Sequence, residues 1–374
     1  MSVRVPAEVF PPGEFIRDEL ETRGWTQGDL AFILGRPLQA VNEIIAGRKA
    51  ITAETAKGLA NAFGASAEMW MNLEAAYRLS RTDGDGDVAR RAKLYELAPV
   101  KEMVKRRWIG ETTGIAALEG ELLRFFQLKD LEQEPELSFA AKMSAPYGAL
   151  SPAHKAWFCR AKQLARAVGA AKFKPQALEQ GLTDLRQLIA SEQDTRRIPK
   201  VLAEMGVRLV IVEHLPKTRI DGAALWLDKE KRQPAVALSL RYDRIDSFWF
   251  TLAHEMMHIR HGDEWSVDDA LVGKEAIPST EKPDYEQRAD REAAEFLVPG
   301  CEIEGFIARV RPQYSKNRII QFANRIQVQP GIIVGQLQRR NEIGWDHSRE
   351  MLVKVRAVLR EAALSDGWGD APTT

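Results

Sequence analysis

The segment TQGDLAFILGRPLQAVNEIIAGRK, residues 26–49, predicts two short helices joined by a tight turn. Thr26, followed three residues later by Asp29, forms a capping-box pattern that opens the first helix. Residues 35–37, Gly-Arg-Pro, supply the turn, and the second helix runs over about residues 38–46. Two short helices at this spacing are typical of a helix-turn-helix.

Three further helices are expected around this pair, so that residues 1–80 form a five-helix domain. One precedes the pair and runs from Glu14 to about Thr22. Two follow it, with Thr52 and Ser66 placed as their N-caps. Apolar residues recur at helical spacing through all five segments, which indicates a common core.

The helix-turn-helix places particular polar residues against DNA. The second helix presents its first residues to base edges, and the first helix crosses the phosphate backbone. Gln27 and the later Arg48 and Lys49 are therefore expected at phosphates. The residues expected to contact bases are Leu38, Gln39, Asn42 and Glu43.

Charge leaves an alternative open for this domain. Residues 1–80 hold 8 Lys and Arg against 10 Asp and Glu, whereas DNA-binding surfaces are basic. A five-helix packing module that does not touch DNA is the alternative. Residues 88–110, with 7 Lys and Arg against 2 Glu, could add phosphate contacts or be a solvated helix face.

Composition sets the class of the whole chain. Its 374 residues balance 53 Lys and Arg against 53 Asp and Glu, which excludes a polybasic protein. Cys159 and Cys301 form no CxxC pair, so a disulfide scaffold and a cysteine-based zinc site are both disfavoured. No apolar run approaches a membrane span. We expect a cytoplasmic, multidomain protein without a membrane segment.

The pattern along the chain predicts a mostly helical protein with one small α+β domain. After the domain at 1–80, the Gly- and Asp-rich residues 81–87 are expected to be a linker and 88–200 a helical connecting region. An α/β domain is expected at 201–345. A C-terminal helix and tail fill 346–374, frayed after Ser365.

Three strands and two helices are expected within 201–345. The strand-like segments are 206–212, 223–227 and 235–240, with Asp221-Gly222 and Pro234 read as turns. Helices follow at 245–261 and at about 284–297, and residues 301–341 are again helical.

The first of these two helices contains the metal-binding motif HEMMH, residues 254–258. His254 and His258 lie one turn apart on a single helix face, so both imidazoles can bind one metal ion. Glu255 is placed to accept a proton from a water molecule activated by that metal. Glu286 is the candidate third ligand, and Asp290 the candidate hydrogen-bond partner of a ligating imidazole.

Several alternatives stay open around this motif. The two histidines could be exposed or satisfied without a metal. His261 could be a ligand, although a charged helix terminus is the stronger interpretation. Tyr242, Tyr285 and Arg288 are equal candidates for stabilising a developing oxyanion.

Residues 250–261, FTLAHEMMHIRH, followed by residues 286–299, EQRADREAAEFLVP, resemble the ImmA/IrrE family of metallopeptidases. The resemblance covers roughly 201–341 and implies a zincin-like mixed α/β fold and a zinc-dependent peptidase that acts on regulatory proteins. It implies Zn²⁺ held by His254, His258 and Glu286, with Glu255 as the catalytic base. Two positions depart from the family, Met257 where Gly is common and Glu292 where Phe is common.

Residues 12–20 (PGEFIRDEL), 41–52 (VNEIIAGRKAIT) and 69–73 (MWMNL) resemble the HigA-type antitoxin branch of the Cro/C1 repressors. This resemblance implies a lambda-repressor-like fold and a homodimer that binds operator DNA and neutralises a toxin. Arg36 and Glu43 depart from the residues usual in that branch.

Together these features predict a transcriptional regulator that carries a zinc peptidase domain and cleaves a regulatory partner or itself. The alternative is an antitoxin-like repressor whose metal domain only senses or scaffolds. A third possibility is an enzyme with a relic helix-turn-helix.

Overall fold

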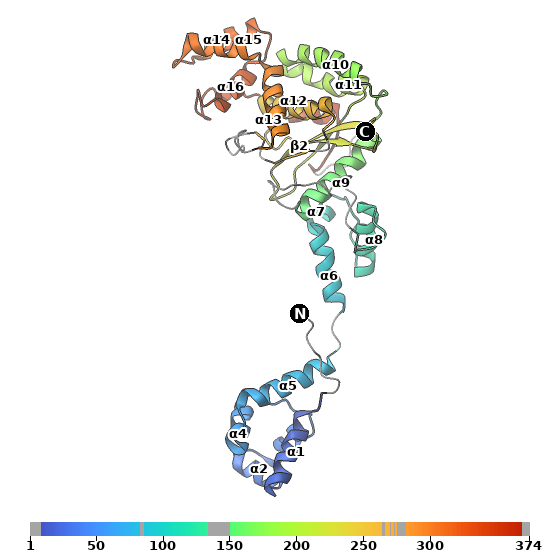
Figure 1. Cartoon of the computed structure of the whole chain (residues 1–374), viewed down its shortest axis with the longest axis vertical. Helices are drawn as coiled ribbons and strands as arrows, with labels where there is room; N and C mark the ends of the chain where they lie inside the picture. Colours follow the sequence, from blue (N-terminus) through green and yellow to red (C-terminus); the bar gives the residue numbers. More distant parts are fainter. Residues whose placement is uncertain are drawn as a thin grey trace. The chain divides into compact units, whose positions relative to one another are not determined.

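The computed structural model of the chain describes residues 9–82, 86–133, 150–263, 266–269, 271–272, 274 and 282–368. The chain divides into two compact units, Met1–Val88 and Ala89–Thr374, each with its own core. Figure 1 shows the helices of the first unit in blue and those of the second in colours from light blue and cyan through green to red. Of the expected linker at 81–87, residues 83–85 lie outside the described part.

The N-terminal unit contains the five helices expected from the sequence. They are α1 (Pro12–Arg23), α2 (Gln27–Leu34), α3 (Leu38–Ile45), α4 (Ala53–Phe63) and α5 (Ala67–Arg81). Their buried faces meet around Trp70, which is fully buried, together with Leu30, Val41 and Leu59. Burial of such apolar side chains is the main favourable contribution to the folding of this unit.

Local sequence signals explain the helix-turn-helix geometry. The Thr26 hydroxyl accepts a hydrogen bond from the Asp29 amide at 3.1 Å, and the Asp29 carboxylate accepts one from the Thr26 amide at 2.7 Å. Gly35 ends α2 in the left-handed region at φ 64°. Arg36, one of the departures noted above, pairs with Glu54 of α4 at 3.1 Å and so helps to hold the turn.

The C-terminal unit is mostly helical around one sheet. From residue 86 onward the described α-helices are α6 (Gly86–Leu97), α7 (Val100–Lys105), α8 (Ile115–Phe126), α9 (Pro152–Ala167), α10 (Pro175–Gln187), α11 (Ile198–Glu204), α12 (Ile245–His261), α13 (Asp284–Leu297), α14 (Gly300–Val310), α15 (Lys316–Arg325), α16 (Pro330–Arg339) and α17 (Arg356–Ala362). Short 3₁₀ helices are η2 (Leu188–Ala190), η3 (Glu192–Arg197) and η5 (Arg349–Met351).

The sheet has the strand order β4-β2-β3-β1-β5. Its strands are β1 (Arg208–Val212), β2 (Ile220–Trp226), β3 (Pro234–Leu238), β4 (Ser266–Asp269) and β5 (Leu364–Asp366). β1 runs parallel to β3 and β5, whereas β2 runs antiparallel to β3 and β4. The sheet is therefore mixed, with the shorter strands β4 and β5 at its edges.

Both faces of the sheet are covered, so its strands are nearly continuous apolar runs. Leu209 and Ile211 face the core that contains α12, whereas Val210 and Val212 face the core that contains α9. Figure 1 shows α12, α10 and α11 on one side of the sheet and α9 on the other. The region 88–200, expected to connect two domains, thus supplies one layer of the C-terminal unit.

Three sequence-based expectations are wrong. The tail after Ser365 is not frayed at its start, because residues 364–366 form β5 and the buried Asp366 pairs with Arg160 of α9. Asp221-Gly222 is not a turn but lies inside β2. Pro234 is not a turn either but the first residue of β3. In the basic segment 88–110, whose role was left open, Arg106 is buried and its guanidinium donates hydrogen bonds to the carbonyls of residues 213 and 214 at 2.8 and 2.9 Å.

Among the described residues, no helix combines the length and the apolar character that crossing a membrane would require.

Candidate functional site

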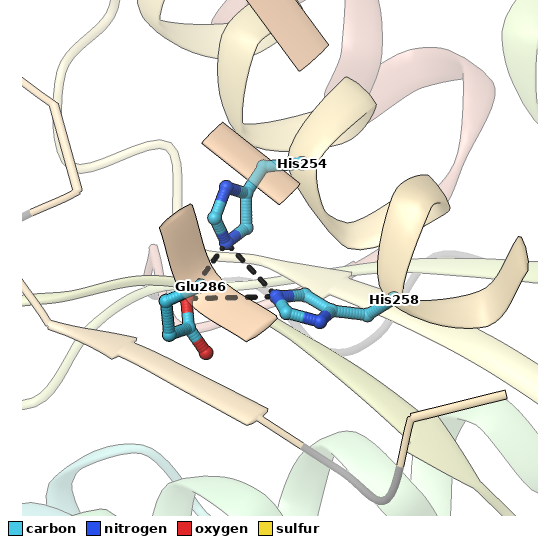
Figure 2. A group of neighbouring side chains, drawn as sticks. All are labelled: His254, His258 and Glu286. Atoms are coloured by element: carbon cyan, nitrogen blue, oxygen red, sulfur yellow. Dashed lines mark hydrogen bonds and ion pairs between the residues drawn. The ribbon is translucent and has the colours of Figure 1, made fainter. Parts of the chain in front are cut away.

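Helices α12 and α13 bring three potential metal ligands together. The His254 Nε2 atom lies 3.0 Å from Glu286 Oε2 and 3.0 Å from His258 Nε2, and His258 Nε2 lies 3.6 Å from Glu286 Oε2. Figure 2 shows the two imidazoles and the carboxylate converging on one point. In the described part of the chain, these three residues form the one group of His, Cys, Asp and Glu side chains with metal-ligand spacing.

The positions of these side chains follow from how α12 and α13 pack. Residues 245–259 of α12 are buried without interruption between the sheet and the surrounding helices. On α13, Ala289 and Ala293 are buried at the contact, and such small side chains permit a close approach of the two helices. Glu286, one turn before Ala289, then reaches the histidines of α12.

Burial shapes the electrostatics of the group. His254 and His258 are fully buried, and Glu286 is almost so. Burial by itself raises the pKa of the Glu286 carboxyl, but hydrogen bonds with the two imidazoles outweigh that effect and hold the pKa well below its usual range. Glu286 is therefore a carboxylate at neutral pH, as a metal ligand must be.

Asp290, the residue expected to support a ligand, lies one turn after Glu286 on α13. Its Oδ1 atom is 3.0 Å from His254 Nδ1, and its Oδ2 accepts a hydrogen bond from Lys282 Nζ at 2.8 Å. Burial by itself raises the pKa of Asp290, but interactions with His254 and Lys282 lower it by more, so that the pKa is about 2. Asp290 thus faces His254 as a carboxylate.

A second carboxylate, which sequence analysis missed, faces the other histidine. Asp263 Oδ2 lies 2.9 Å from His258 Nδ1, and both Asp263 oxygens accept hydrogen bonds from Arg288 Nη2 of α13, at 2.7 and 2.8 Å. The available signal was Gly262, a glycine directly after the motif helix, which indicates that the chain turns back there. Arg288, a candidate for oxyanion stabilisation, is instead engaged with Asp263.

Glu255 lies beside the ligands on α12 and is fully buried. It packs against β2 at Gly222: a Cβ atom there would stand 2.6 Å from Glu255 Oε1 and 2.6 Å from Thr251 Cγ2. Any larger residue at position 222 would therefore displace one of these side chains. Gly222 is a site residue that the sequence, read as a turn, did not reveal.

The remaining candidates lie outside the ligand group. His261 binds Glu292 at 2.8 Å near the exposed end of α12, and Met257 is buried in the apolar core. The Tyr242 ring lies under the Arg241 guanidinium at 4.5 Å. The Tyr285 ring lies 6.1 Å from the His258 ring, so it is the aromatic candidate next to the ligands.

The expected DNA-contacting residues form a solvent-facing set on the N-terminal unit. Gln27, Leu38, Gln39, Arg48 and Lys49 are exposed, and Asn42 and Glu43 are half-buried. Gln39 Nε2 donates a hydrogen bond to Glu43 Oε1 at 3.2 Å. α3 thus presents a polar face to solvent while Val41, Ile44 and Ile45 fill the core.

Comparisons with known proteins match the N-terminal unit. Residues 16–70 match a helix-turn-helix family model. The chain is 37% identical over 75 residues to "Virulence-associated protein I" of Dichelobacter nodosus, a match that covers 20% of this chain and 69% of that protein.

Two solved structures are also similar. One is an addiction module antidote protein of the HigA family from Coxiella burnetii, 37% identical, with 19% of this chain and 79% of that chain covered and a TM-score of 0.19. The other is the Pseudomonas aeruginosa antitoxin HigA with the higBA promoter, 31% identical, with 25% and 98% covered and a TM-score of 0.20.

The contact between Gly222 and Glu255 leads to a prediction about stability. Gly222→Ala forces a methyl group against two buried side chains and should lower the free energy of unfolding by about 1–3 kcal/mol. The matched control is Gly120→Ala in α8, where a Cβ would contact nothing within 4 Å and helix propensity favours Ala. Thermal melting should show a loss for the first variant alone, and equal melting temperatures would contradict the close contact.

Proposed function

The chain belongs, through its N-terminal domain, to the helix-turn-helix family, and on that basis we propose that it is an antitoxin-like transcriptional regulator that carries a zinc-dependent peptidase domain. The observation that carries the peptidase half is the convergence of His254, His258 and Glu286 beside Glu255.

The DNA-binding half rests on the side chains that α3 leaves in solvent. The exposed Gln39 can form paired hydrogen bonds with adenine, and the exposed Leu38 can contact a thymine methyl. Asn42 is half-buried with its Oδ1 atom buried, so only its amide nitrogen can be offered to a base. Arg48 and Lys49 follow directly and suit phosphates. This polar set also argues against a relic domain, for which nothing would keep such residues exposed in the position of a recognition helix.

The donor atoms fit a zinc ion. Asp263 hydrogen-bonds with His258 Nδ1, and Asp290 lies as a carboxylate 3.0 Å from His254 Nδ1. With a proton on each Nδ1 atom, both Nε2 atoms would offer lone pairs to a metal. His254 Nε2 lies within hydrogen-bonding distance of His258 Nε2 and of Glu286 Oε2, both at 3.0 Å, and a cation bound between the three atoms would replace these contacts by coordination bonds. Two imidazoles and one carboxylate with an open fourth position are the ligand set of catalytic zinc sites.

The roles of the residues in peptide hydrolysis follow from this arrangement. When bound, zinc would supply a Lewis acid that polarises the scissile carbonyl. Glu255 accepts a proton from the attacking water and passes it to the leaving amine. Glu255 is fully buried beside the two histidines, and Gly222 of β2 leaves the space that its carboxylate occupies.

A specific observation favours the alternative function. His254, His258 and Glu255 have no exposed surface, whereas a peptide substrate would have to reach the metal and the catalytic base. A regulator that binds metal for sensing or scaffolding, without cleavage, therefore remains the second candidate. The catalytic variant described below separates the two.

The proposed partners follow from both halves. The DNA partner is double-stranded operator DNA, and a palindromic operator would be bound by a homodimer. The protein partner is a toxin, as the HigA-type resemblance implies, or another regulatory protein that the peptidase cleaves. Cleavage of such a partner, or of the chain itself, would relieve repression.

DNA binding is tested with a duplex from upstream of the protein's own coding sequence. In a mobility-shift titration at modest salt, Gln39→Ala should weaken binding about tenfold, because it removes hydrogen bonds to one base. Asn61→Ala, an exposed change on α4, is the control and should bind like the wild type. If the wild type shifts no fragment, the DNA-binding proposal is wrong.

The metal site is tested by zinc content after purification without chelators. The wild type should hold about one zinc per chain, and Glu286→Ala much less, because two imidazoles alone do not retain zinc well. Glu292→Ala, on the same helix but paired with His261, should keep the wild-type content. A zinc-free wild type would remove the basis of the peptidase proposal.

Catalysis is tested with Glu255→Gln, which keeps the size of the side chain but cannot accept a proton. This variant should retain zinc yet show no cleavage when a co-encoded toxin, or a second copy of the chain, is incubated with it and the fragments are analysed by mass spectrometry. Cleavage by the variant would show that Glu255 is not the base. A wild type that holds zinc but cleaves neither protein would favour the sensing role.

A further inference from the structure

The two ligand histidines have matching surroundings. The Nδ1 atom of each imidazole lies against a carboxylate, and each carboxylate accepts a hydrogen bond from a Lys or Arg side chain. For His254 these partners are Asp290 and Lys282. For His258 they are Asp263 and Arg288. The first carboxylate lies on the helix that holds Glu286, whereas the second follows the motif helix itself.

The position of Asp263 is fixed by its backbone. Gly262 ends α12 in the left-handed region at φ 64°, which turns the chain back toward the helix. The Asp263 amide then donates a hydrogen bond to the His258 carbonyl at 3.0 Å, and its own carbonyl accepts one from the Trp226 indole at 2.8 Å. The Gly262 carbonyl accepts a further one from Lys231 Nζ at 2.5 Å. Asp263 is thus tied to α12 and to β2 at once.

Arg288 gives this carboxylate a connection to the second ligand helix. It lies on α13, two residues after Glu286, and its Nη2 atom binds both oxygens of Asp263. The ion pair therefore joins the turn after α12 to α13, the two segments whose separation decides whether Glu286 reaches the histidines. Part of the Arg288 side chain is exposed, so its replacement disturbs little of the core.

We propose that Asp263, held by Arg288, is the positioning residue of His258. Because a carboxylate can only accept, it fixes the proton of His258 on Nδ1 and leaves the Nε2 lone pair facing Glu286 and His254. Partners of this kind orient a metal-ligating imidazole and raise its basicity. The inference rests on the zinc site proposed above and adds two residues, neither of which is a ligand.

Zinc affinity is the measurement that tests the proposal, by competition with a chromophoric chelator on the full-length protein. Asp263→Ala should lower the affinity by about 10–100-fold, the usual effect of losing such a partner. Asp263→Asn should lower it less, because the amide oxygen still accepts from Nδ1 while its charge is gone. Arg288→Gln should lower it by a few fold, and Arg291→Gln, an exposed change on the same helix, should leave it unchanged.

Melting with and without zinc distinguishes positioning from a structural role. A purely structural Asp263 would lower the melting temperature of the metal-free protein and leave the zinc-induced increase as in the wild type. A positioning residue reduces that increase, since the stabilisation by a ligand follows its affinity. If Asp263→Ala fails to fold, the Arg288→Gln and Asp263→Asn variants decide the question by the same two readouts.

The outcomes separate this inference from the proposed function. A wild type that binds zinc, with the Asp263 and Arg288 variants binding it equally tightly, overturns the positioning role alone. A wild type that binds no zinc overturns the metal site and this inference together. The inference is supported if zinc affinity falls most for Asp263→Ala, less for Asp263→Asn and least for Arg288→Gln, and does not change for Arg291→Gln.

Discussion

The close contact of α12 and α13 is the constraint on which the C-terminal unit depends. The histidines lie on one helix and Glu286 on the other, and Glu286 is 28 positions after His258 in the sequence. Ala289 and Ala293 allow these helices to approach, and a larger side chain at either position would move the carboxylate away from the imidazoles. The Asp263–Arg288 ion pair joins the same two segments from outside the contact.

The sheet supports this contact from below. β2 passes under α12, and Gly222 leaves the space that Glu255 and Thr251 occupy. Its neighbour Asp221 is buried and binds the Arg241 guanidinium at 2.9 and 3.0 Å, which holds the start of β2 to the chain after β3. The second layer, α9, covers the opposite face and keeps the sheet out of water. Because α12 is buried along most of its length, every charged group beside the histidines needs a partner, and the two carboxylate–cation pairs supply them.

The N-terminal unit works by a different physical principle. Its core is apolar and its functional residues are solvent-facing, so DNA recognition requires no buried charge. The polar face of α3 depends on local signals, namely the capping box of α2 and the left-handed Gly35, and the Arg36–Glu54 ion pair links the turn to α4.

The sequence by itself determined the elements whose signals are local. Capping residues, glycines and helical periodicity predicted the five helices at the N-terminus, and the motif helix at 245–261 and its partner at 284–297 have the predicted bounds. The spacing of His254 and His258 also follows from helix geometry alone.

What only the tertiary structure decided depends on contacts between distant segments. Residues 221–222 belong to a strand because β2 pairs with β3 and β4, and residues 364–366 because they pair with β1. No local pattern shows this, since a glycine in a strand and a glycine in a turn look the same in the sequence. The burial of Arg106 and the meeting of Asp263 with Arg288 arise in the same way, because ion pairs between separate segments form only once packing has brought those segments together.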